Sequence, residues 1–173
     1  MSEHVVLVDD NDQPLGTMEK MEAHEKALLH RAFSVFIFNQ KGEMLIHQRA
    51  HHKYHSGGLW TNACCSHPRE NETPLEAAKR RLVEEMGFVC DLEKAFEFKY
   101  KSKLDNNLTE HEYDHVFVGT YDDVPPFNTD EVADFKYIAV DKLLKDIEQN
   151  PTNYTEWFKI AVNKVIEFKN KTF

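Results

Sequence analysis

The segment from Thr73 to Gly87 constrains the fold more than any other part of this sequence, because it carries signals for both ends of an amphipathic helix. Thr73 suits the N-cap, Pro74 suits the first helical position, and Glu76 completes a capping box. Gly87 is placed to end the helix. Apolar residues recur at helical spacing and are expected to face a core: Leu75, Ala78, Leu82 and Met86.

Segments with strand character lie on both sides of this helix. Residues 32–38 and 43–48 are rich in β-formers, and residues 39–42 between them make a good hairpin turn. Further strands are predicted at residues 5–8, 90–101, 112–121 and 134–140, and two closing helices at residues 141–148 and 155–169. Because predicted strands and predicted helices are interspersed along the chain, we expect an α/β sandwich.

Length and charge limit the classes of function. The 173 residues with 41% apolar content can bury one sizeable core, so we expect a single domain over residues 1–173. The net charge of −9 disfavours a broad surface for nucleic acid or an anionic membrane, so an anionic substrate needs a local cationic pocket. The amino terminus lacks a secretion signal, and three cysteines without a disulfide framework predict a reducing cytoplasm.

Two clusters of side chains carry the chemistry of acids, bases and metal ions. In residues 60–68, the thiol of Cys65 lies two positions before the imidazole of His67. In the second cluster, Glu110 and Glu112 share one face of an extended chain, so both carboxylates can point at one cation. A thiol, an imidazole and carboxylates together indicate metal-assisted acid/base catalysis.

A pair of histidines, His24 and His30, forms a third candidate cluster. At six residues apart they would not share a face of a regular helix, so both can reach one ion only if the chain bends between them. Five other histidines are expected to be surface or hydrogen-bonded side chains: His51, His52, His55, His111 and His115.

Residues 66–88 resemble a degenerate Nudix box, G-x5-E-x7-R-E-U-x-E-E-x-G-U, in which U is aliphatic. The matching positions are Glu72, Arg80, Leu82, Glu84, Glu85 and Gly87. Ser66 replaces the first glycine, Arg81 replaces the glutamate that follows the arginine, and Phe88 is apolar but not aliphatic. Because Nudix hydrolases use the box carboxylates to gather divalent cations, Arg81 argues against ordinary hydrolysis. The resemblance implies a Nudix-like α/β/α sandwich with a mixed β-sheet and a changed reaction.

The chain from about Val5 to Trp157 is similar to the type 1 isopentenyl-diphosphate Δ-isomerases of the Nudix superfamily. These enzymes interconvert isopentenyl diphosphate and dimethylallyl diphosphate in isoprenoid biosynthesis. The similarity rests on residues 28–33, residues 60–68, the helix that ends at Gly87, and residues 110–112. One such motif is weak support, whereas four in the same order are strong.

The resemblance implies two metal sites. One divalent ion, Mn²⁺, Zn²⁺ or Fe²⁺, would be held by His24, His30, His67, Glu110 and Glu112. Imidazole with carboxylate suits these metals, and five ligands fit an octahedral site better than a tetrahedral zinc. Mg²⁺ would bridge the substrate diphosphate to Glu85 and to the backbone carbonyl of Cys65.

The resemblance also implies the residues that bind and convert the substrate. Those that grip the diphosphate would be Lys20, Arg49, Lys53, Ser66 and Arg81. Glu112 with Tyr100 would donate the proton, and Cys65 on the opposite face would accept one, with the roles exchanged in reverse. Trp157, and Trp60 as a second candidate, would stabilise a carbocation through the face of the indole ring.

Two other functions remain open. A Nudix hydrolase would cleave a nucleoside diphosphate derivative and would not need Cys65. A metal-binding interaction module would use Cys64, Cys65 and His67 for structural zinc, although the sequence offers no second half-site to complete a tetrahedron. For the isomerase we expect a small-molecule diphosphate substrate, no nucleic acid or membrane partner, and a monomer or weak dimer.

Overall fold

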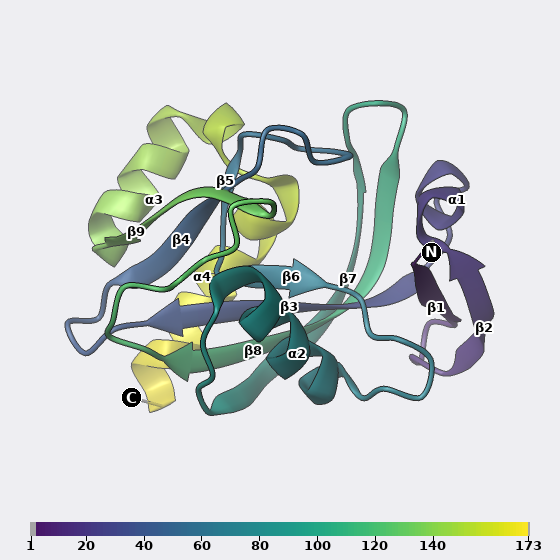
Figure 1. Ribbon diagram of the computed structural model, residues 1–173, viewed down its shortest axis with the longest axis horizontal. Helices are drawn as coiled ribbons and strands as arrows, with labels where there is room; N and C mark the ends of the chain where they lie inside the picture. Colours follow the sequence, from purple (N-terminus) through teal and green to yellow (C-terminus); the bar gives the residue numbers. More distant parts are fainter. Residues whose placement is uncertain (1–2, 173) are drawn as a thin grey trace.

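A computed structural model describes residues 3–172 of the chain, and in this part nine strands form one mixed sheet (Figure 1). The strands are β1 His4–Val8, β2 Pro14–Glu19, β3 His30–Phe38, β4 Met44–Arg49, β5 Trp60–Thr61, β6 Cys64–Ser66, β7 Leu92–Lys103, β8 Thr109–Thr120 and β9 Val132–Ile138. The helices are α1 Lys20–Glu25, α2 Pro74–Met86, α3 Val140–Gln149, α4 Glu156–Thr172 and a short 3₁₀ turn at Pro151–Asn153.

Strand β3 lies at the centre of the sheet. It runs parallel to β8 over its whole length and antiparallel to β1, β4 and β6. Its side chains alternate between two hydrophobic cores: Phe36 and Phe38 face one, and Phe33, Val35 and Ile37 face the other. A strand buried on both faces needs a continuous apolar run, which is why this segment shows no polar alternation.

Helices cover both faces of the sheet. Ala77, Ala78, Leu82 and Met86 of α2 pack into the core on one face. On the other face, α3 and α4 complete the second core, where the rings of Phe36 and Phe158 stack with centroids 5.9 Å apart. The predicted α/β sandwich with a mixed sheet is therefore confirmed.

The ends of α2 lie where the sequence predicts them. The Thr73 hydroxyl accepts a hydrogen bond from the backbone N–H of Glu76 at 3.1 Å, and Pro74 opens the helix. Gly87 ends it in the left-handed conformation, with φ +77°. Its N–H donates to the carbonyls of Leu82 and Val83, which satisfies groups that would otherwise lack partners.

Some predicted features differ in the structure. Leu75 was expected in the core but stays 37% exposed, because helical spacing fixes its direction and not whether the core extends to the first turn. β8 begins at Thr109 rather than 112, so both acidic residues of the second cluster are strand residues. Helix α1 and strands β2, β5 and β6 were not predicted, since they are short and take their stability from neighbouring elements.

The carboxyl-terminal helix is anchored at its start. The hydroxyls of Thr61 and Thr155 lie 2.8 Å apart, and the Thr155 N–H donates to the carbonyl of Trp60 at 3.0 Å. These bonds join β5 to the residue before α4 and fix the first turn, which carries Trp157. Within residues 3–172, the helices all fall short of the length and apolar character needed to cross a membrane.

Substitution of Gly87 by Ala should destabilise the protein. The left-handed backbone costs a residue with a Cβ about 1–3 kcal/mol, and an added Cβ would lie 2.3 Å from the carbonyl oxygen of Pro126. The matched control is Gly42→Ala, where φ is +80° but the nearest atom is the flexible Lys169 Nζ. Urea unfolding should show the larger loss for Gly87→Ala, and equal losses would contradict the packing argument.

Candidate active site

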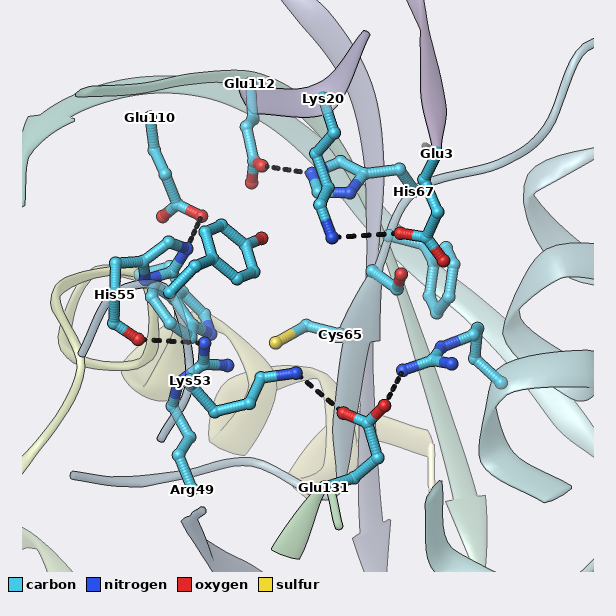
Figure 2. A pocket seen from close by; sticks show the side chains of 15 residues that line it. Glu3, Lys20, Arg49, Lys53, His55, Cys65, His67, Glu110, Glu112 and Glu131 are labelled. Carbon is cyan, nitrogen blue, oxygen red and sulfur yellow. Dashed lines mark hydrogen bonds and ion pairs between the residues drawn. The ribbon is translucent and has the colours of Figure 1, made fainter. Parts of the chain in front are cut away.

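A cavity of about 140 Å³ opens at one end of the sheet and is lined mainly by charged and polar side chains (Figure 2). Its acidic and imidazole residues are Glu3, His55, His67, Glu110, Glu112 and Glu131; its cations are Lys20, Arg49, Lys53 and Arg81; the others are Phe33, Tyr54, Cys65, Ser66 and Trp157. Of the fourteen residues predicted to bind metal or substrate or to act in catalysis, ten line this cavity.

The other four predicted residues lie outside the cavity lining. His24 and His30 contact His67, with ring centroids 5.7 and 5.0 Å from it. Tyr100 donates to the carboxylates of Glu110 and Glu112. Glu85 belongs to α2 and is also outside the lining, but it approaches Arg81, which does line the cavity, at 3.6 Å.

Strand register assembles one part of the site. In the sheet, His30 of β3 and Tyr100 of β7 both lie opposite Glu112 of β8. Cys65 of β6 lies opposite Ser34 of β3. Because side chains alternate along a strand, Cys65 points into the cavity while Cys64 faces the α2 core.

Four side chains bring atoms that can bind a metal ion close together next to these paired strands. His24, His30, His67 and Glu112 each present a nitrogen or oxygen within 4.8 Å of the other three. His24 comes from the last turn of α1, and the chain then reverses through Ala27, whose φ is +56°. The bend that the spacing of the two histidines requires is therefore present.

The tautomers of two of these histidines are fixed by backbone carbonyls. His24 Nδ1 lies 2.7 Å from the carbonyl of Lys20, and His30 Nδ1 lies 2.9 Å from that of Leu28. A carbonyl only accepts, so each Nδ1 carries a hydrogen and the Nε2 of each ring is left to face the cluster. His24 Nε2 is buried and has no hydrogen-bond partner among residues 3–172.

The cluster needs positive charge at its centre. His30 Nε2 and His67 Nε2 lie 3.2 and 2.9 Å from Glu112 Oε2. Burial lowers the pKa of His67 to about 4, so its ring is neutral at pH 7. Burial favours the neutral form of Glu112, but the contacts with His30 and His67 outweigh it and hold its pKa well below the usual range. Imidazole nitrogens and a carboxylate that face one point fit a divalent transition-metal ion.

Glu110 lies on the other side of this centre. Its carboxylate groups with His24 and His55, again with ligand atoms within 4.8 Å of one another. The Tyr100 hydroxyl lies 2.9 Å from Glu110 and 2.5 Å from Glu112, and so connects the two carboxylates. Burial, followed by the charge of Glu112, raises the pKa of Glu110 well above its usual value.

Three of the four cations that line the cavity are paired with acidic residues. Lys20 contacts Glu3 at 2.9 Å, and Lys53 contacts Glu131 at 2.6 Å (Figure 2). Arg81 reaches Glu131 at 3.5 Å. The cavity thus concentrates positive groups within a protein whose net charge is −9, as an anionic substrate requires.

Two further buried residues, Glu85 and Arg49, lie beside Lys20, Lys53 and Arg81. Glu85 accepts a hydrogen bond from the Cys64 thiol at 2.8 Å, and burial raises the pKa of this carboxyl. Arg49 donates to the carbonyl of His55 at 3.1 Å and lies 5.3 Å from the ring centre of Trp157. The guanidinium of Arg49 therefore lies against the indole ring of Trp157 at the back of the cavity.

Comparison with known proteins places this site in a family. Residues 28–158 match the NUDIX domain model. An isopentenyl-diphosphate Delta-isomerase of Pectobacterium atrosepticum is 49% identical over 95% of this chain and 92% of its own length. Isopentenyl-diphosphate Delta-isomerase 2 of Photorhabdus laumondii is 52% identical over 94% and 92%. The chain belongs to the isopentenyl-diphosphate Delta-isomerase family.

Solved structures with the same fold are less similar in sequence to this isomerase-family protein than the relatives named above. DR0079 of Deinococcus radiodurans has a TM-score of 0.77 at 18% identity, covering 93% of this chain and 98% of its own. A MutT protein of Methanosarcina mazei has a TM-score of 0.66 at 16% identity, covering 83% and 94%. At this identity the likeness shows the fold alone.

The degenerate Nudix box of this family member is held by its own ion pairs. Arg80 binds Glu72 through two nitrogens at 2.8 and 2.9 Å and approaches Glu84 at 3.1 Å. Arg81, which replaces the box glutamate, points instead to Glu85 and the cavity.

Five cavity residues were missed in the sequence: Phe33, Tyr54 and three that carry acidic or imidazole side chains. His55 was expected to be a surface or hydrogen-bonded side chain, yet it is buried in the cavity wall. Glu3 and Glu131 were not singled out, although they pair with Lys20 and Lys53. All three lie outside the regular elements that periodicity detects, and the sequence carries no signal that could have revealed their contacts.

Metal binding should stabilise the folded protein through Glu112 and its histidine neighbours. Mn²⁺ at 100 times its dissociation constant should add about 2.7 kcal/mol to the free energy of unfolding, because the unfolded chain lacks the cluster. Calorimetry should show this gain for the wild-type protein and for His4→Ala, an exposed control. Glu112→Gln should lose most of it, and an equal gain in that variant would assign the ion to another site.

Proposed function

We propose that this protein interconverts isopentenyl diphosphate and dimethylallyl diphosphate. The observation that carries the proposal is the placement of Cys65 and Glu112 on the wall of one cavity that also holds four cationic side chains. The names of the 45–52% identical relatives support this reaction. The proposal includes a single-domain, cytoplasmic protein, monomeric or weakly dimeric; the free thiols of Cys64, Cys65 and Cys90 fit a reducing compartment.

The cationic wall is suited to a diphosphate. Lys20, Lys53 and Arg81 are held near the cavity by Glu3 and Glu131, so they are ordered before an anion arrives. An arginine can bind phosphate through two parallel hydrogen bonds, and a lysine acts as a point charge. In the proposal these three residues, with Arg49 and the hydroxyl of Ser66, bind the substrate diphosphate.

The donor set at each predicted metal site agrees with the chemistry of the ion proposed there. His24, His30, His67, Glu110 and Glu112 would hold Mn²⁺, Zn²⁺ or Fe²⁺, and Glu85 with the carbonyl of Cys65 would hold Mg²⁺ on the diphosphate. When bound, the first ion would supply positive charge beside Glu110 and Glu112, and Mg²⁺ would neutralise the diphosphate.

The reaction needs an acid and a base on opposite faces of the alkene. A proton added to the terminal carbon of isopentenyl diphosphate gives a tertiary carbocation, and loss of a proton from the neighbouring methylene gives dimethylallyl diphosphate. We assign the first transfer to Glu112 with Tyr100, whose hydroxyl lies 2.5 Å from that carboxylate. Cys65 takes the second proton, and the roles exchange in reverse.

The pKa shifts in the free protein favour one protonation state of this cycle. Burial raises the pKa of the Cys65 thiol well above its usual range, so sulfur carries the proton while Glu112 is ionised. In our assignment this is the state left after the forward reaction and the starting state of the reverse one. Before another forward reaction, the pair of Glu112 and Tyr100 must therefore regain a proton, and Cys65 must lose one.

The carbocation needs a site that excludes water and offers an electron-rich ring. Trp157 is 3% exposed and lines the cavity from the first turn of α4. An indole face attracts a cation by about 2 kcal/mol or more when both are desolvated. We assign Trp157 this role. Trp60 lies outside the cavity lining and has Lys136 over its ring, so it is not included.

Cys65→Ala separates the isomerase from a Nudix hydrolase. It should reduce formation of dimethylallyl diphosphate by at least about 10³-fold, because no other residue in our assignment replaces the lost base. A hydrolase would keep its release of phosphate from nucleoside diphosphate derivatives. The assay therefore measures both reactions in the same preparations.

The matched control is Cys90→Ala, which removes a partly buried thiol outside the cavity lining. It should leave isomerisation unchanged. A Cys65→Ala protein with normal isomerisation would rule out the proposed acid/base pair.

A further inference from the structure

Beside the five predicted ligands, the site contains a fourth imidazole, that of His55. This side chain is 2% exposed, and its Nε2 lies 3.7 Å from Glu110 Oε2 (Figure 2). Its other ring nitrogen, Nδ1, lies 3.1 Å from the Ser56 hydroxyl. The ring thus directs one nitrogen to a neighbour in the loop and the other to a buried carboxylate.

The loop between β4 and β5 holds this ring in place through three contacts. Arg49 donates to the carbonyl of His55 at 3.1 Å, and the Ser56 N–H donates to Asp105 at 3.0 Å. The side-chain amide of Asn106 donates to the carbonyl of Tyr54 at 3.2 Å. A side chain fixed on both sides in this way is ordered before any ligand binds.

The two groups of ligand atoms at this end of the cavity share His24. One contains His30, His67 and Glu112, and the other contains His55 and Glu110. His24 has a single free nitrogen, Nε2, because Nδ1 is bonded to the carbonyl of Lys20. One nitrogen lone pair binds one ion, so an ion on His24 Nε2 would lie beside both groups.

We propose that His55 is a sixth protein ligand of this centre, with Nε2 as the donor atom. In this proposal the two groups, each with its own ligand atoms within 4.8 Å of one another, close around one ion held by His24, His30, His55, His67, Glu110 and Glu112. Four imidazoles and two carboxylates satisfy an octahedral ion without a position for water or substrate. The inference rests on the metal centre of the proposed function and deepens it: the ion fixes and polarises the two carboxylates and does not touch the alkene.

Nitrogen NMR of the imidazoles tests this on the whole protein with Zn²⁺ alone and no substrate. In the wild-type protein, Zn²⁺ should shift the Nε2 signals of His24, His30, His55 and His67. Signals of His24, His30 and His67 that shift while His55 does not would overturn the sixth ligand and leave the metal centre intact. If none of the four shifts, the metal centre itself fails, and the inference fails with it.

Zn²⁺ affinity, measured by competition with a chelating dye, gives a second readout that is independent of isomerisation. His55→Ala should weaken Zn²⁺ binding by at least about tenfold, the loss typical when an outer partner of a metal ligand is removed. His52→Ala, an exposed histidine of the same loop, should bind as the wild type does. His24→Ala should lose binding more severely, and unchanged affinity in His55→Ala alone would contradict the proposal.

Discussion

The parallel pairing of β3 with β8 is the constraint on which the site depends. Its register sets His30 opposite Glu112, and the antiparallel pairing of β7 sets Tyr100 opposite the same carboxylate. A slip of one residue would move Glu112 to the other face of the sheet and separate it from His67. The apolar residues of β3, buried on both faces, prevent such a slip. Packing of the two cores thus fixes the geometry of the polar cluster.

Charge explains how the Nudix fold accommodates a different reaction. The box position that carries a glutamate in the Nudix pattern carries Arg81 here, and Arg81 lines the cavity between Glu85 and Glu131. This exchange replaces an acidic side chain by one that binds anions, while the rest of the box keeps its structural ion pairs around Arg80. The scaffold is retained, and the chemistry follows from the side chains placed on it.

The parts of the structure that follow local rules could be predicted from the sequence. Helix α2 was located correctly because its caps and apolar spacing are local signals, whereas Leu75 was misplaced because the extent of the core is not. The convergence of His24 and His30 depends on the backbone at Ala27, which no pattern reveals. His55 reaches Glu110 only through contacts of a loop with Asp105 and Asn106, about fifty residues away. The roles of the site residues came from family resemblance and stay proposals.

Proton NMR of isopentenyl diphosphate in heavy water, with the protein, Mg²⁺ and Mn²⁺, tests the central claim most directly. If Glu112 with Tyr100 adds a solvent-derived proton and Cys65 removes another, methyl signals of dimethylallyl diphosphate should grow and carry deuterium. Continued incubation should also place deuterium in the remaining isopentenyl diphosphate, because the reverse reaction uses the same groups. Unchanged substrate with folded, metal-loaded protein, or product free of deuterium, would contradict the account.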